Sequence, residues 1–203
     1  FNRPRVAAAG NDKALTYRLA AELGLPMLDT VFVPAGMEIP DSIWLDLPWV
    51  VKSATGWGGK EVFLVKSKPE ARAIRGQLPH TSLIVQPLCT GWGRDVRVFV
   101  VGRRIIAAVL RCSLSDFRAN YSLGGSCELY HLSEKDREMV QAIIDELNPD
   151  MVGIDFLIDA GGRLLLNEIE DAVGSRTLSL LTDINLLEIF MSHVRERLEA
   201  EKP

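Results

Sequence analysis

Apolar and polar residues alternate with two different periods along the chain, one typical of helices and one typical of strands. In the helical stretches apolar residues recur every three or four positions, so one face of each helix would be apolar. Asn11 and Ser133 stand where they could cap helix N-termini, and Gly24 followed by Pro26 ends the first stretch. Helices are expected over residues 11–23, 69–76, 133–147 and 183–200.

The strand-like stretches are short, and several form pairs around turn residues. Strands are expected within residues 30–36, 48–53, 61–65, 82–88, 95–102, 103–111, 151–159 and 163–170. Hairpins and helices alternate without the regular strand–helix rhythm of a doubly wound parallel sheet. This order predicts an α+β fold with two lobes that meet near residues 86–94.

Composition changes this picture only by excluding some functions. The 203 residues are 47% hydrophobic and 25% charged, with a net charge of −4, which gives no electrostatic footprint for nucleic acid or an anionic membrane. No apolar run approaches the roughly 20 residues that span a bilayer. Cys89, Cys112 and Cys127 form no CxxC pair. They argue against a disulfide framework or a zinc site, and favour the reducing cytoplasm.

The strongest candidate site is a group of acidic residues in the last predicted hairpin. Because side chains alternate along a strand, Leu166, Glu168 and Glu170 are expected on one face. A four-residue turn would place Asp155 opposite Leu166 and diagonal to Glu168, roughly 7–8 Å away. Converging carboxylates suit Mg²⁺, a hard cation that prefers oxygen ligands. A solvated outer face bearing acids is about equally compatible with this hairpin alone.

The segment TGWGGK, at residues 55–60, joins two predicted strands. A Walker A loop is excluded because Ala54 replaces its first glycine, Glu61 follows the lysine, and no helix comes next. A glycine loop can still bind phosphates through its backbone N–H groups, although a plain hairpin turn explains the loop more simply. Lys52 follows an apolar strand, where it needs an anionic partner or protects a sheet edge.

Basic residues gather in the middle of the chain. Asp95 and Arg97 share a strand face, and Arg111, Arg118 and Asn120 follow. Cationic groups of this kind could stabilise the charge that develops in phosphoryl transfer. Surface ion pairs would explain them equally, and would contribute little to stability. The three histidines lie far apart, so Ser-His-Asp or Cys-His catalysis has no local support.

The order of these segments resembles the RimK-type α-L-glutamate ligase family of the ATP-grasp superfamily. The resemblance runs from NDKALTYRLAAELGLP to the last helix, and is most specific in GRDVRVFVVGRRIIAAVLR, DFRANYSLGG, GIDFLI and LLLNEIE. It implies an ATP-grasp fold with ATP between two α+β lobes. Residues 1–24 would form a linker and first helix, 25–88 the smaller lobe, and 89–203 the larger lobe. The N-terminal domain that usually precedes this fold is expected to be absent from the chain.

The resemblance also implies roles for individual residues. Asp155, Glu168 and Glu170 would bind Mg²⁺ or Mn²⁺, while Arg111 and Arg118 would be catalytic. The expected nucleotide contacts are Lys13, Lys52, Gly56, Gly59, Gln86, Pro87, Leu88, Asp95, Arg118, Asn120 and Leu166.

Three positions depart from the family pattern. Glu61 stands where a further glycine is common, Pro87 replaces an acidic residue, and Glu170 replaces asparagine. The resemblance implies an ATP-dependent ligase that joins a carboxylate to an amine through an acylphosphate. The added amino acid would be one such as glutamate, the acceptor a small molecule, peptide or carrier protein, and a homo-oligomer is compatible. The alternative is a non-catalytic ATP-binding module, or a subunit of a larger ligase.

Overall fold

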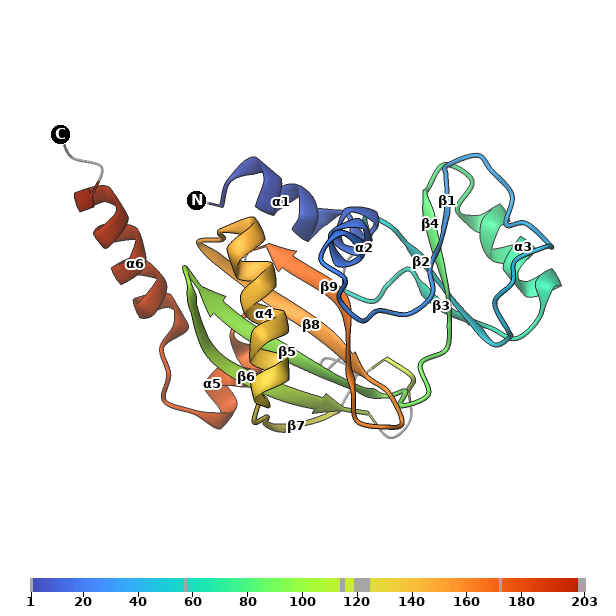
Figure 1. The fold of residues 1–203 in the computed structure, drawn as a ribbon. Coiled ribbons are helices and arrows are strands. Elements are labelled where there is room, and N and C mark those ends of the chain that lie inside the picture. The colour runs from blue at the N-terminus through green and yellow to red at the C-terminus, as the bar shows by residue number, and fades with distance from the viewer. Residues whose placement is uncertain (1, 57, 114–115, 119–124, 172, 201–203) are drawn as a thin grey trace.

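Two antiparallel sheets organise the chain, and helix α2 lies between them, whereas α1 lies over the larger sheet (Figure 1). The structure is a computed structural model that describes residues 2–56, 58–113, 116–118, 125–171 and 173–200. The predicted α+β fold is confirmed. Within these ranges no helix is long and apolar enough to cross a membrane.

The larger sheet contains the two hairpins expected from the second half of the sequence. Its strand order is β7-β6-β5-β8-β9. The strands are β5 (Arg94–Val101), β6 (Arg104–Cys112), β7 (Ser126–Leu129), β8 (Met151–Ile158) and β9 (Leu164–Asp171). The expected strands agree with these bounds except for β7, which the sequence did not indicate.

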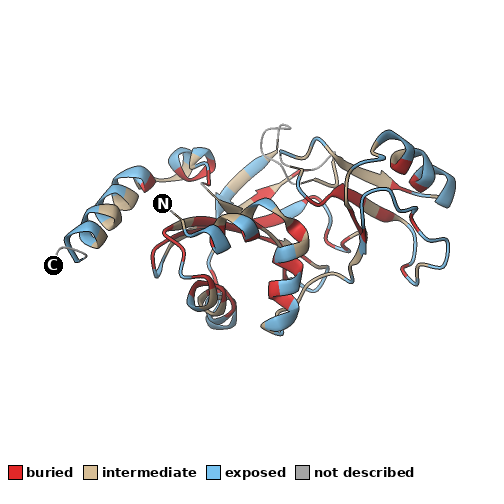
Figure 2. Ribbon diagram, turned by 90° about the horizontal axis from the view of Figure 1, so that it is seen from above, coloured by how far each residue is buried: buried red, intermediate tan, exposed pale blue. Residues whose placement is uncertain are grey.

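Helix α4 (Glu134–Leu147) covers one face of this sheet and closes the main hydrophobic core. Ser133 begins the helix with a capping box, in which Asp136 returns a hydrogen bond to the Ser133 backbone. Helices α5 (Arg176–Leu181) and α6 (Leu186–Ala200) pack on the opposite face, around Phe99 and Val101. Figure 2 shows that α6 is mostly exposed, whereas buried residues follow the sheet and the inner side of α4.

The smaller sheet has the order β1-β4-β2-β3 and is covered by α3 (Lys68–Gln77). Its strands are β1 (Val31–Val33), β2 (Trp49–Ser53), β3 (Val62–Val65) and β4 (Leu83–Pro87). Trp49, Val51 and Val85 lie in a separate core beneath α3. Each lobe therefore has its own apolar interior, and the two sheets face a shared space.

Helices α1 (Pro4–Asn11) and α2 (Lys13–Glu22) both contact β9, and α2 also packs against Ile84 of the smaller sheet through Tyr17, so α2 bridges the lobes. The expectation that Asn11 caps the first helix is wrong, because Asn11 ends α1. Asp12 is the cap of α2, and its carboxylate accepts a hydrogen bond from the Ala14 backbone N–H. Pro4 starts α1 because its missing N–H would have no partner in a first helical turn.

At Gly91, the connection between the lobes passes very close to the β8–β9 turn. A Cβ atom there would lie 2.1 Å from the Ile158 carbonyl oxygen and 2.9 Å from Asp159. We expect Gly91→Ala to lower the free energy of unfolding by about 1–3 kcal/mol, the usual cost of overpacking. Urea unfolding measures the effect.

Gly76 in α3 provides the matched control for this substitution. It has no atom within 4 Å of its would-be Cβ. Gly76→Ala is therefore expected to be neutral, or to stabilise the protein by about 0.5–1 kcal/mol, since alanine favours helices. Equal destabilisation by both variants would contradict the close approach at Gly91.

Candidate functional site

A cavity of about 340 Å³ lies between the two sheets and collects most of the expected site residues. Of those residues, it is lined by Lys13, Lys52, Gly56, Gly59, Gln86, Pro87, Leu88, Asp95, Arg111, Arg118, Asp155, Glu168 and Glu170. Asn120 lies outside the described residues. Leu166 does not line the cavity, because its side chain is buried in the core beneath α4.

The expected pairing of the acidic hairpin is wrong, by one residue on the turn side of the hairpin and by two residues at Asp155. Asp155 lies directly opposite Glu168, and Leu166 lies opposite Phe156. A β-bulge at Asn167 inserts an extra residue into β9, so the alternation of side chains shifts at that point. The register at the turn places Leu166 opposite the core residue Phe156, and the bulge then brings Glu168 to the cavity side.

Opposite charges meet across four neighbouring strands at one level of the larger sheet. Arg111 on β6 lies opposite Asp95 on β5, and Arg97 on β5 lies opposite Asp155 on β8. Arg111 donates to Asp95 at 2.6 and 2.7 Å and to Asp155 at 2.8 Å. Arg97 forms two hydrogen bonds to Asp155, at 2.8 and 2.6 Å, and an ion pair with Glu170 at 2.6 Å.

These pairs set the protonation of the buried acids. Burial disfavours the charged form of Asp155, but Arg111 and Arg97 outweigh it and lower the pKa of Asp155 to about 2. Burial and the charge of Asp155 raise the pKa of Glu170, although Arg97 opposes the shift. The sequence had placed Arg97 beside Asp95 on one strand face, among the candidate cationic groups, but had given it no role of its own.

Lys13 connects the glycine-rich loop to the acidic strand. Its ammonium group lies 2.8 Å from Glu168 Oε1 and also donates to the Gly56 carbonyl. On the other side of the loop, Arg118 donates to the Gly59 carbonyl at 3.0 Å. Gly58 and Gly59 have φ values of +68° and +72°, a backbone conformation that favours glycine. The loop is thus held over the cavity by α2 on one side and by the larger lobe on the other.

Lys52 is not an edge-strand lysine, because β2 lies between β3 and β4. Its side chain is buried, with the residue only 5% exposed. The ammonium donates to the Tyr17 hydroxyl at 2.7 Å and to Asn167 Oδ1 at 2.9 Å. Burial lowers the pKa of Lys52 to about 8, in spite of the charge of Glu168. Neither Tyr17 nor Asn167 was expected at the site, since no pattern within one segment brings them together.

Residues 86–88, the expected nucleotide contacts where the two lobes meet, lie at and just after the end of β4. Leu88 donates its backbone N–H to the Pro48 carbonyl at 3.0 Å, and Pro87 has no N–H to offer. The Gln86 side chain donates to the Thr30 hydroxyl at 2.8 Å. A nucleobase placed here would therefore find no backbone N–H at Pro87, and the backbone N–H of Leu88 already donates to Pro48.

The acidic residues fit a divalent cation in the chemistry of their donors, since all are carboxylates. Among the described residues, however, no three acidic, histidine or cysteine side chains are arranged as a preformed metal site. Glu168 is paired with Lys13, while Asp155 and Glu170 are paired with Arg97. A metal ion would have to share or replace these contacts.

Comparison with known proteins identifies the family. A family model described as "RimK-like ATP-grasp domain" matches residues 11–193. The chain is 31% identical over 210 residues to mouse β-citrylglutamate synthase B, covering 98% of this chain and 54% of the synthase. It is 29% identical over 201 residues to the probable α-L-glutamate ligase 2 of Shewanella baltica, covering 96% of this chain and 66% of the ligase.

A solved structure shows the same fold at lower sequence identity. The D-alanine–D-alanine ligase of Bacillus anthracis, crystallised with ATP, matches with a TM-score of 0.75 and 14% identity. The match covers 98% of this chain and 71% of that ligase. The chain spans about half the length of the mouse synthase. The family match, the two-lobed fold and the shared cavity agree with the predicted resemblance: this chain belongs to the RimK-like ATP-grasp family.

Proposed function

We propose that this chain forms the nucleotide-binding and catalytic part of a ligase that joins a carboxylate to an amine and converts ATP to ADP and phosphate. The main support is one cavity that combines a glycine-rich loop, the two lysines Lys13 and Lys52, and the acidic group at the β8–β9 hairpin. Cations and carboxylates arranged around one cavity suit phosphoryl transfer.

In this proposal the substrate carboxylate attacks the γ-phosphate of ATP, and the amine then displaces phosphate from the acylphosphate. Lys13 and Lys52 hold the phosphates, and the N–H groups of the glycine-rich loop cover them. Arg111 and Arg118 stabilise the charge on the transferred group. Asp155, Glu168 and Glu170 would hold Mg²⁺ or Mn²⁺, which neutralises phosphate charge when bound. No side chain needs to act as a nucleophile, because positioning and charge stabilisation carry the reaction.

The names of the relatives support glutamate as the added amino acid. They include a probable α-L-glutamate ligase, a β-citrylglutamate synthase and a human N-acetylaspartylglutamate synthase that is 34% identical over 183 residues. We propose L-glutamate as the amine. For the acceptor we propose a carboxylate on a small metabolite, a peptide or a carrier protein.

A coupled assay of ADP release tests this function. Each reaction contains the protein, ATP, Mg²⁺, L-glutamate and one member of a panel of carboxylic acids and peptides. We expect ADP release only when both substrates are present, with mass spectrometry detecting an amide product. Omission of Mg²⁺ should abolish release, and Mn²⁺ should restore it.

The alternative, a non-catalytic ATP-binding module, is favoured by one observation. Every proposed metal ligand is already paired with a lysine or an arginine of the same chain. ATP binding by calorimetry, with no ADP release and no amide product across the whole panel, would support that alternative over the ligase.

A further inference from the structure

Lys52 differs from Lys13 in the kind of partner that holds its ammonium group. Lys13 forms an ion pair with the carboxylate of Glu168. Lys52 instead donates to two neutral oxygens, the hydroxyl of Tyr17 and the side-chain carbonyl of Asn167. A buried lysine without a carboxylate partner is unusual, because burial of an unpaired charge is costly.

The two partners of Lys52 come from different parts of the fold. Lys52 is on β2 of the smaller sheet, Tyr17 is on α2, and Asn167 is the extra residue of the bulge in β9. The residues Tyr17 and Lys52 are each only 5% exposed. The ammonium therefore stands where three elements meet, and its position depends on all of them.

The Tyr17 hydroxyl is itself fixed by further hydrogen bonds. Its oxygen lies 3.3 Å from Gln86 Oε1 and 3.2 Å from Asn167 Oδ1, so its single proton can point to either acceptor. The Gln86 amide group in turn donates to Thr30. Burial raises the pKa of Tyr17, which keeps the hydroxyl protonated at neutral pH. A neutral, oriented hydroxyl is thus present to accept a hydrogen bond from the Lys52 ammonium group.

Neutral partners leave the charge of Lys52 available to a ligand. An ammonium group has three N–H donors, and two of them point to Tyr17 and Asn167. Lys52 also lines the cavity, so the third donor can reach a ligand there. A carboxylate partner would compete with an anionic ligand for the same charge, whereas a hydroxyl and an amide oxygen orient the ammonium without neutralising it.

We propose that Tyr17 is a positioning residue, which acts with Asn167 to hold the Lys52 ammonium toward the phosphates of a bound nucleotide. The inference rests on the proposed ATP-binding function of the cavity. A lysine side chain has about 2 kcal/mol of rotamer entropy to lose when it is fixed. The hydrogen bond to Tyr17 removes part of that freedom before the nucleotide arrives, and phosphate binding is stronger as a result.

Tyr17→Phe tests the role with little change of shape. We expect the Kd for ADP to rise by about 5- to 10-fold, in the range for the loss of one ordinary hydrogen bond. The Kd for adenosine should not change, because adenosine has no phosphate for Lys52 to contact. Tyr130→Phe is the matched control, since Tyr130 does not line the cavity, and it should leave both constants unchanged.

A double-mutant cycle separates positioning from a general structural effect. In a Lys52→Met background, Tyr17→Phe should change the Kd for ADP by less than about 2-fold, because the group that it positions is gone. Equal losses in both backgrounds, or an equal loss for adenosine, would overturn the proposal. If Tyr17→Phe does not fold, Asn167→Ala provides the second variant, with the same selective loss for ADP expected.

The outcomes distinguish this inference from the proposed function. A wild-type protein that binds neither ADP nor ATP contradicts the proposed function. A wild-type protein that binds ADP, together with a Tyr17→Phe variant of equal affinity, overturns only the role of Tyr17.

Discussion

Replacing Glu168 by glutamine is expected to lower amine-dependent ADP release by at least about 100-fold, the upper end of losses seen when groups supporting a metal site are removed. Glu168 lies directly opposite Asp155 and is paired with Lys13, so it connects the proposed metal ligands with a lysine proposed to bind phosphate. Glutamine keeps the size of the side chain but loses the charge that a hard cation requires. The coupled ADP assay at saturating ATP measures the loss.

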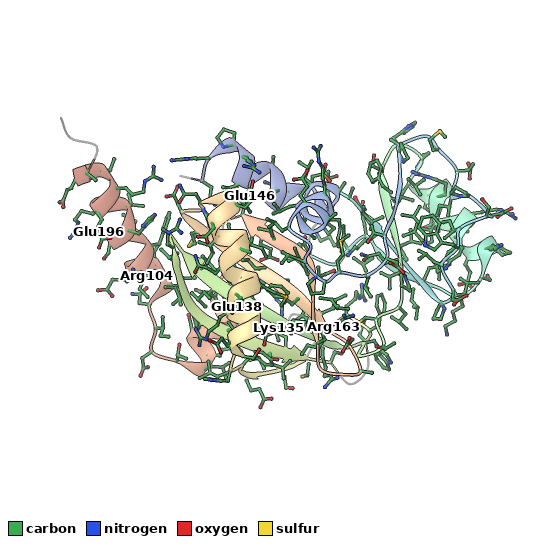
Figure 3. The ribbon with its side chains drawn as sticks, in the orientation of Figure 1. Arg104, Lys135, Glu138, Glu146, Arg163 and Glu196 are labelled. Atoms are coloured by element: carbon green, nitrogen blue, oxygen red, sulfur yellow. The ribbon has the colours of Figure 1, made fainter. Side chains whose placement is uncertain are left out.

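Two further measurements make this result specific. Binding of Mn²⁺ in the presence of ADP, followed by electron paramagnetic resonance, should weaken in the same variant. Glu138→Gln on α4 is the matched control, because Glu138 is exposed on the helix that covers the opposite face of the sheet (Figure 3). Full activity of Glu168→Gln would remove the metal assignment and the ligase proposal together.

Replacing Lys52 by methionine is expected to weaken ADP binding by about 10- to 100-fold and yet to stabilise the fold. The loss follows from removing a charged donor to phosphate. The gain follows because burial lowers the pKa of Lys52 from 10.5 to about 8, so keeping this group charged opposes folding. We expect the free energy of unfolding to rise by about 1–3 kcal/mol at pH 7. Calorimetry with ADP and urea unfolding measure the two effects.

The stability gain of Lys52→Met should depend on pH with a definite sign. Below about pH 8 Lys52 is charged in both the folded and unfolded states, and the wild-type protein bears the full cost of burial. Between about pH 8 and 10.5 the folded state releases the proton that the unfolded state still binds, so the cost fades. The difference between variant and wild type should therefore be largest at pH 7 and smaller at pH 9.5.

Lys135→Met on α4 serves as the control, because Lys135 is exposed (Figure 3). It should leave ADP affinity unchanged and alter stability by less than about 0.5 kcal/mol, as surface substitutions usually do. A difference for Lys52→Met that does not shrink at high pH would contradict the buried-charge explanation.

Much of the fold was readable from local patterns, because the features that indicate it lie within single segments. The apolar period and the cap at Ser133 predicted α4, and the turn at Gly102 and Arg103 predicted the β5–β6 hairpin. Helices α1 and α5 were missed, since both are short. Strand β7 was missed as well, because its four residues are mostly exposed and carry no apolar stripe.

The types of residue at the site were equally readable, because an acidic or basic side chain keeps its chemistry wherever it lies. The sequence indicated a group of carboxylates at Asp155, Glu168 and Glu170 and a fold of two α+β lobes, but left open whether Lys52 has an anionic partner or protects a sheet edge. The sequence of a single segment does not determine which side chains come into contact. A bulge arises from the pairing of two strands, so the shift at Asn167 that separates the face of Leu166 from the face of Glu168 could not be seen in β9 alone.

The dependence on pairing between distant elements also explains the contacts that no single segment predicted. Tyr17, Lys52 and Asn167 lie on three elements separated by more than thirty residues, and only the packing of α2 against both lobes brings them within hydrogen-bond distance. Long-range contacts depend on how elements pack, which a local pattern does not encode. The sequence thus predicted the family and the chemical type of the cavity residues. Which charged side chains pair with one another was decided by the tertiary structure, through the packing of the two sheets and α2.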